Sequence, residues 1–136
     1  MDNIFASCKD ISLILHNSTD EAYFQIILNE TYEEIGHISY TYENNEVVGN
    51  LSYFIYKEYR NKGYAKMALK LFVNNVRNID DKDLYLAITP DNIASIKLAK
   101  SQNAKFIGTV SIPARYVFSD DGKHDYANMY KIEFKE

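Results

Sequence analysis

The hydrophobic period of the chain changes at Gly63. Residues 47–56 alternate between two faces with a period of two, which is typical of a β-strand. After Gly63 the apolar residues recur at helical spacing, which predicts an amphipathic helix built on Ala65, Ala68, Leu69, Phe72 and Val76. The unbroken apolar run Leu84–Ile88 then favours a strand that is covered on both faces. A strand, a helix and a strand in this order predict a crossover connection between two parallel strands.

Strand patterns dominate the part of the chain before this crossover. Residues 23–28 and 35–42 are rich in aromatic and β-branched residues, and polar stretches separate them. Residues 11–16 fit a further strand, followed by a short polar turn. The pattern predicts an antiparallel meander in the first part of the chain.

A second helix is expected after the crossover, over residues 93–102. Asn92 is a candidate N-cap, and Asn103 can take the left-handed conformation that ends a helix. Two strands, over residues 105–112 and 126–134, follow it. The chain as a whole predicts an α/β fold of the α+β type, with a mixed sheet.

Composition limits the class of protein. The length of 136 residues fits one domain, so residues 1–136 are expected to share a single core. The net charge of −4 argues against a nucleic-acid-binding surface, and no apolar run approaches the roughly 20 residues that span a bilayer. The start of the chain lacks the pattern of a secretory signal, and the single cysteine, Cys8, fits a reducing compartment. We therefore expect a cytoplasmic protein with no membrane or nucleic-acid partner.

The junction of strand and helix carries the strongest chemical signal. A helix start presents unpaired N–H groups and a partial positive charge, so it can hold a phosphate or pyrophosphate. Gly63 lets the backbone approach such a ligand without a Cβ, and Arg60 and Lys62 add positive charge. The spacing alone also fits an ordinary strand-to-helix turn with a solvated arginine.

Two segments of the chain resemble signatures of the GNAT acetyltransferases. Arg60, Gly63 and Ala65 fit the acyl-CoA signature R/Q-x-x-G-x-G/A, which follows a strand in that family. Residues 92–108 are similar to the second signature, a helix that opens with Asn and leads into a strand containing Phe. The two segments occur in the order of the family and at about its separation.

The resemblance implies acetyl-CoA as co-substrate. It places the pantetheine arm between the strand that ends at Tyr56 and the strand Leu84–Ile88, with the pyrophosphate on the loop before the first helix. It assigns cofactor contacts to Ile55, Tyr56, Lys57, Arg60, Asn61, Lys62, Gly63, Tyr64, Ala65, Asn92 and Ser95. For Asn92 and Ser95, helix capping is an equally good interpretation.

The catalytic groups are not fixed by the resemblance. The position of the usual acid, a tyrosine of the second helix, is Ala99 here, whereas Ser95 fits an Asn-x-x-Ser pattern of relatives that acetylate protein N-termini or antibiotics. Candidates for a substitute acid are Tyr116, Tyr126 and Tyr130, and His37 is a candidate base that could deprotonate the amine. Each of them also fits a packing or hydrogen-bonding role. The histidines lack metal-ligand spacing, so no metal is expected.

The N-terminal part departs from the family. Two helices normally lie between the first two strands, but residues 17–22 cannot hold them. The acceptor site is then expected to be open or completed by a second subunit, as in a homodimer. We expect an N-acetyltransferase, an acyltransferase that moves an acetyl group from acetyl-CoA to a primary amine of a small molecule or a peptide N-terminus by direct attack. The alternatives are a non-catalytic acyl-CoA-binding or regulatory module and a domain that serves only in assembly.

Overall fold

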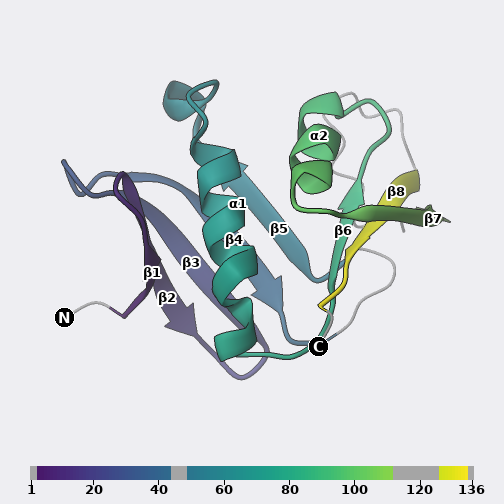
Figure 1. Ribbon diagram of the computed structural model, residues 1–136, viewed down its shortest axis with the longest axis horizontal. Coiled ribbons are helices and arrows are strands. Elements are labelled where there is room, and N and C mark those ends of the chain that lie inside the picture. Colours follow the sequence, from purple (N-terminus) through teal and green to yellow (C-terminus); the bar gives the residue numbers. More distant parts are fainter. Residues whose placement is uncertain (1–2, 44–48, 112–125, 135–136) are drawn as a thin grey trace. The chain divides into compact units, whose positions relative to one another are not determined.

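The computed structural model describes residues 3–43, 49–111 and 126–134. The chain forms two compact units. The first unit contains residues 1–43 and 51–81, and the second contains residues 44–50 and 82–136. The expectation of a single domain over residues 1–136 stays a prediction. The mixed α/β fold class is confirmed: both units combine a sheet with a helix (Figure 1).

The first unit is built on a five-stranded antiparallel sheet in the order β1-β2-β3-β4-β5. The bounds of its elements are β1 (Ile4–Ser7), β2 (Ile11–Asn17), β3 (Glu21–Leu28), β4 (Glu34–Thr41), β5 (Leu51–Ile55), η1 (Lys57–Tyr59), α1 (Tyr64–Asn75) and η2 (Val76–Asn78). The predicted meander is therefore confirmed, and β1 is a strand that the sequence did not predict. A tight turn at Ser18 joins β2 to β3, so this connection holds no helices, as expected.

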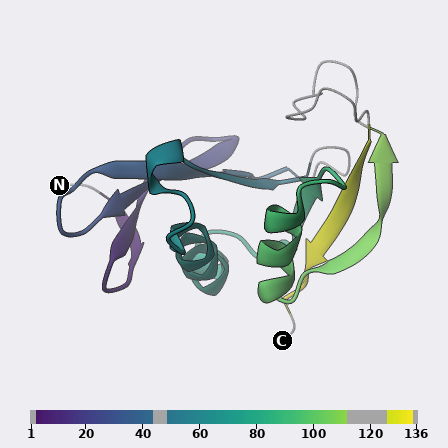
Figure 2. The same cartoon turned by 90° about the horizontal axis from the view of Figure 1, so that it is seen from above.

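Helix α1 covers one face of this sheet (Figure 2). The ring of Phe72 on α1 lies 5.2 Å from that of Phe24 on β3 and 5.6 Å from that of Tyr40 on β4. All three side chains are fully buried, and burial of each such side chain contributes about 1.5–3 kcal/mol. The hydroxyl of Tyr40 donates to Asp80 at 2.6 Å, which satisfies the polar end of a buried ring.

The opposite face of the sheet, called the outer face below, is polar and aromatic. Because side chains alternate along a strand, the neighbours of buried Phe24 point away from α1. The register places Gln25 of β3 opposite His37 of β4, and His37 opposite Phe54 of β5. The outer face thus gathers side chains from neighbouring strands, and α1, which covers the opposite face, does not cover it.

In its described residues, the second unit has a three-stranded antiparallel sheet in the order β6-β8-β7 and one helix. Its elements are β6 (Leu84–Ile88), α2 (Ile93–Ser101), β7 (Lys105–Ser111) and β8 (Tyr126–Ile132). Leu84, Leu86 and Ile88 are buried, whereas the residues between them are half-buried, so β6 is not equally covered on both faces. Within the described residues β6 pairs antiparallel with β8 and belongs to a different sheet from β5, so the parallel direction expected for β5 and β6 stays a prediction.

A buried asparagine organises the start of the second unit. Asn50 is 2% exposed; its Oδ1 accepts from the Tyr85 amide at 2.8 Å, and its Nδ2 donates to the Asp83 carbonyl at 3.0 Å. The backbone amide of Asn50 adds a bond of 2.9 Å to the Tyr85 carbonyl. Next to it, a Cβ at Gly49 would collide with the Tyr85 carbonyl, and the φ of +77° also favours glycine.

Candidate cofactor site

The loop between β5 and α1 has the geometry of an anion site. Gly63 is the N-cap of α1, no side chain caps the helix, and its first turn contains no acidic residue. The Met67 amide donates to the Gly63 carbonyl at 3.2 Å, so the amides of Tyr64, Ala65 and Lys66 precede the i to i−4 pattern. These amides and the helix dipole present positive charge at the end of an exposed loop. The structure therefore places residues 60–65 in one exposed turn at the start of α1, and their contact with a phosphate stays a prediction.

Gly63 is required by conformation more than by packing. Its φ is +85°, in the left-handed region, and a Cβ built there would have no heavy atom within 4 Å. Asn61 also has a left-handed φ, of 64°. Asparagine tolerates this conformation better than most residues. The loop therefore contains two residues, Asn61 and Gly63, in the left-handed backbone conformation. The open space beside Gly63 leaves room for a ligand.

Arg60 folds back onto the strand that precedes the loop. Its Nε donates to the Ile55 carbonyl at 2.8 Å, and its guanidinium carbon lies 4.9 Å from the centre of the Phe54 ring. Lys62 places its Nζ 6.0 Å from the ring of Tyr59, whose hydroxyl donates to Glu33 at 2.9 Å. This hydrogen bond raises the pKa of Tyr59. Both cations of the predicted signature thus lie over aromatic rings at the loop.

The backbone at the end of β5 offers groups on its outer edge. The Tyr56 amide donates to the Ile35 carbonyl of β4 at 2.8 Å. In an antiparallel pair successive residues point to opposite edges, so the N–H and C=O of Ile55 point away from β4. The Ile55 carbonyl accepts from Arg60, and the Lys57 carbonyl accepts from the Arg60 amide at 3.3 Å. Part of the segment expected to pair with pantetheine is therefore already used by the loop itself.

A hydrogen-bonded chain crosses the outer face next to this segment. Tyr56 donates to Oε2 of Glu34, and Gln25 donates to Oε1 of Glu34 at 2.6 Å. The Oε1 of Gln25 lies 2.6 Å from Nε2 of His16. A bulge at the start of β4 makes this possible: Glu34 pairs with Ile27 and Gly36 with Ile26, so one extra residue of β4 lies between them. The extra residue brings Glu34 to the face of Gln25.

His37, a candidate base, lies among the rings of the same face. Its ring is stacked on Tyr23 at 5.5 Å and on Phe54 at 5.8 Å, and Tyr56 lies 6.2 Å away. Its Nδ1 is buried and has no hydrogen-bond partner within the described residues. His37 is therefore part of an aromatic layer that ends at Phe54.

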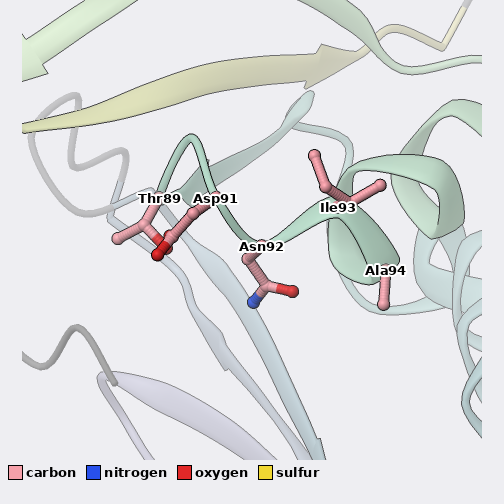
Figure 3. A pocket seen from close by; sticks show the side chains of 5 residues that line it. All are labelled: Thr89, Asp91, Asn92, Ile93 and Ala94. Carbon is pink, nitrogen blue, oxygen red and sulfur yellow. The ribbon is translucent and has the colours of Figure 1, made fainter. Parts of the chain in front are cut away.

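The second helix confirms the capping interpretation of Asn92. Its Oδ1 accepts from the Ser95 amide at 3.2 Å, and Asn103 after the helix has a left-handed φ of 65°. Asn92 also lines an open hollow of about 340 Å³ with Thr89, Asp91, Ile93 and Ala94 (Figure 3). Cofactor contacts from Asn92 and Ser95 stay a prediction.

The candidate acids differ in accessibility. Tyr126, at the start of β8, is 41% exposed, whereas Tyr130 is 4% exposed and packs edge-on against Phe106. Tyr116 lies outside the described residues. Ala99 is fully buried on α2. Burial favours a packing role for Tyr130. Tyr126 is the more accessible of the two described tyrosine candidates.

Two absences hold for residues 3–43, 49–111 and 126–134. No group of three or more His, Cys, Asp or Glu residues is arranged there to hold a metal ion. No helix in these ranges has the length and apolar character needed to cross a membrane.

Phe54 and Gln25 are two neighbours of the site that the sequence did not predict. The alternation over residues 47–56 placed Phe54 on one face of a strand, but its contact with Arg60 depends on the path of the loop. Gln25 reaches Glu34 only through the bulge, for which the sequence carries no separate signal.

Comparison with known proteins gives the same fold and a family. The profile of the acetyltransferase (GNAT) domain matches residues 2–105. A comparison with curated proteins finds no match.

Among solved structures, the chain is similar to RimL, a ribosomal L7/L12 α-N-protein acetyltransferase, with a TM-score of 0.74 and 14% identity over 98% of this chain and 96% of that one. It is also similar to a GNAT acetyltransferase from Streptococcus pneumoniae, with a TM-score of 0.66 and 19% identity over 87% of this chain and 70% of that one. A third similar structure is Mycobacterium smegmatis RimJ in complex with CoA-disulfide, with a TM-score of 0.64 and 17% identity over 83% of this chain and 53% of that one.

At these identities the structural neighbours show the fold alone, whereas the profile covers most of the chain and includes the whole loop of residues 60–65. The chain belongs to the GNAT acetyltransferase family.

Proposed function

We propose that this protein is an N-acetyltransferase that moves the acetyl group of acetyl-CoA to a primary amine. The observation that carries the proposal is the exposed, uncapped start of α1 at Gly63, where backbone amides and the helix dipole favour an anion. A pyrophosphate supplies such an anion. Membership of the GNAT family and the similarity to a structure that contains CoA-disulfide support a CoA ester as the ligand.

In this proposal the loop of residues 60–65 holds the pyrophosphate, and the outer edge of β5 holds the pantetheine arm. The Ile55 amide points to that edge, so it can donate to an amide carbonyl of the arm. Contacts of Asn92 and Ser95 with the cofactor belong to the same proposal.

The reaction requires no covalent enzyme intermediate. The nitrogen of the neutral amine attacks the thioester carbonyl, the C–S bond breaks, and the departing CoA thiolate takes up a proton while the nitrogen loses one. A backbone N–H at the strand edge stabilises the oxyanion that forms in between. Tyr126, Tyr116 and His37 are the candidates for proton transfer, and Tyr130 is disfavoured by its burial.

The acceptor class is either a small amine or a peptide N-terminus. The similar fold of RimL motivates peptide N-termini as the first acceptors to test. The absence of helices between β2 and β3 supports an open acceptor site, or one completed by a second copy of the chain. A cytoplasmic location belongs to the same proposal, because the single cysteine fits a reducing compartment.

A second candidate function is a non-catalytic acyl-CoA-binding or regulatory module. It is favoured by Ala99, which stands at the position of the usual acid. Release of free CoA thiol from acetyl-CoA, measured with amines and N-terminal peptides, separates the two. Thiol release that depends on both the amine and the protein supports the enzyme, whereas tight acetyl-CoA binding without release with any amine supports the binding module.

A further inference from the structure

Phe54 occupies an unusual place for a large aromatic side chain. It is 46% exposed, on the outer face of β5, one residue before the strand ends. One contact of its ring is the stacked ring of His37, at 5.8 Å. Another is the guanidinium of Arg60, at 4.9 Å. Because the ring is exposed, packing in a core does not explain its position, whereas its contact with Arg60 links it to the loop of residues 60–65.

Arg60 is held at two points of the same strand. Its Nε donates to the Ile55 carbonyl at 2.8 Å, and the Phe54 ring lies under its planar end. A planar guanidinium can make both interactions at once, whereas the ammonium of a lysine is a point charge with neither the fork nor the flat face. The arrangement therefore depends on arginine and not simply on positive charge.

The two anchors act at the start of the anion-binding turn. Arg60 is followed by two left-handed residues, Asn61 and Gly63, before α1 begins. Ordering such a turn costs conformational entropy, and a turn that is ordered before the ligand arrives does not incur this cost on binding.

We propose that Phe54 is a positioning residue that holds the Arg60 side chain against the end of β5 and so pre-orders the loop that binds the pyrophosphate. The inference rests on the proposed function for its effect on cofactor affinity. The pre-ordering itself is a property of the free protein. The rival arrangement is one in which Arg60 acts as a charge on the phosphate and Phe54 is incidental.

The first test is the dissociation constant for acetyl-CoA in four variants, with Ser52→Ala as the control on the same strand and face. Phe54→Leu is expected to weaken binding about three- to ten-fold, and Phe54→Tyr, which keeps the aromatic face, to stay within about two-fold of wild type. Arg60→Lys is expected to weaken binding as much as Phe54→Leu does. Phe54→Leu added to Arg60→Lys is expected to have little further effect, because the pair acts as a unit. Wild-type affinity in Arg60→Lys, or losses of affinity that add up in the double variant, would overturn the proposal.

The second test does not need the cofactor. Amide hydrogen exchange of residues 61–64 in the free protein is expected to be faster in Phe54→Leu than in wild type, with Phe54→Tyr and Ser52→Ala unchanged. Unchanged exchange in Phe54→Leu would contradict the pre-ordering. If wild type fails to bind acetyl-CoA while exchange responds as expected, the proposed function fails and the role of Phe54 stands.

Discussion

The hydroxyl of Tyr56, at the end of β5, donates a hydrogen bond to Glu34, at the start of β4. Burial raises the pKa of Glu34, but the hydrogen bonds from Tyr56 and Gln25 and the charges of His37 and His16 outweigh it, so the pKa is lowered. The same bond to Glu34 raises the pKa of Tyr56 to about 12. The pair thus keeps a carboxylate ionised beside the segment proposed to bind pantetheine.

The Glu34 carboxylate should make stability depend on pH. Because its pKa in the folded protein lies below the usual 4.5, its contribution is complete above that value and is lost as the pH falls through the folded pKa. We expect Glu34→Gln to be less stable than wild type by about 1 kcal/mol near neutral pH, and the difference to shrink in acid. Urea unfolding of both proteins over this pH range checks it. A difference that grows as the pH falls would contradict the assignment.

The Nδ1 of His37 has no hydrogen-bond partner among the residues that the structure describes, which predicts a stabilising substitution. A buried polar atom without a partner costs about 1–3 kcal/mol, and His37→Phe removes it while keeping a ring against Tyr23 and Phe54. The free energy of unfolding is expected to rise by about 1 kcal/mol. Tyr23→Leu, which breaks the stack, is expected to lower it. A loss of stability in His37→Phe would mean that Nδ1 has a partner such as an ordered water.

A side chain at position Gly36 should destabilise the fold. It pairs with Ile55, and a Cβ there would collide with the Phe54 carbonyl and lie 3.0 Å from the Ile55 Cα. Because these atoms belong to the backbone, Gly36→Ala is expected to cost about 1–3 kcal/mol. Thermal unfolding measures the loss, and Ser39→Ala, on the same strand, serves as the control. Equal stability of both variants would show that β4 and β5 can separate without penalty.

Both ends of the Asn50 side-chain amide should contribute to the stability of the fold. Asn50→Leu leaves the Tyr85 amide and the Asp83 carbonyl without their side-chain partner and is expected to cost about 1–3 kcal/mol. Asn50→Asp keeps the acceptor for Tyr85 but loses the donor to Asp83, so a large part of the loss should remain. Chemical unfolding of the two variants gives the comparison. Wild-type stability in Asn50→Leu would show that water replaces both bonds.

Several local features could be predicted because neighbouring residues determine them. The change of period at Gly63 correctly predicted the start of α1, and Asn92 and Asn103 marked the two ends of α2. Backbone groups at helix ends need partners or special conformations, and Asn and Gly supply them within a few residues.

Other features depend on contacts between distant strands. Residues 4–7 form too short a strand to show a period, and they are defined by pairing with β2. The bulge that turns Glu34 toward Gln25 depends on the register of β3 and β4. The contact of Phe54 with Arg60 depends on the path of the loop. A sequence pattern alone specifies neither the register of paired strands nor the path of a loop.

The proposed function requires the start of α1 to hold the pyrophosphate of acetyl-CoA. Calorimetric titration with acetyl-CoA tests it most directly, with free CoA and adenosine diphosphate as comparators and Gly63→Trp as the variant that fills the open space beside the loop. We expect wild type to bind acetyl-CoA in about the micromolar range and a folded Gly63→Trp to bind it at least ten-fold more weakly. Equal affinity of the two folded proteins, or no binding of acetyl-CoA by wild type, would contradict it.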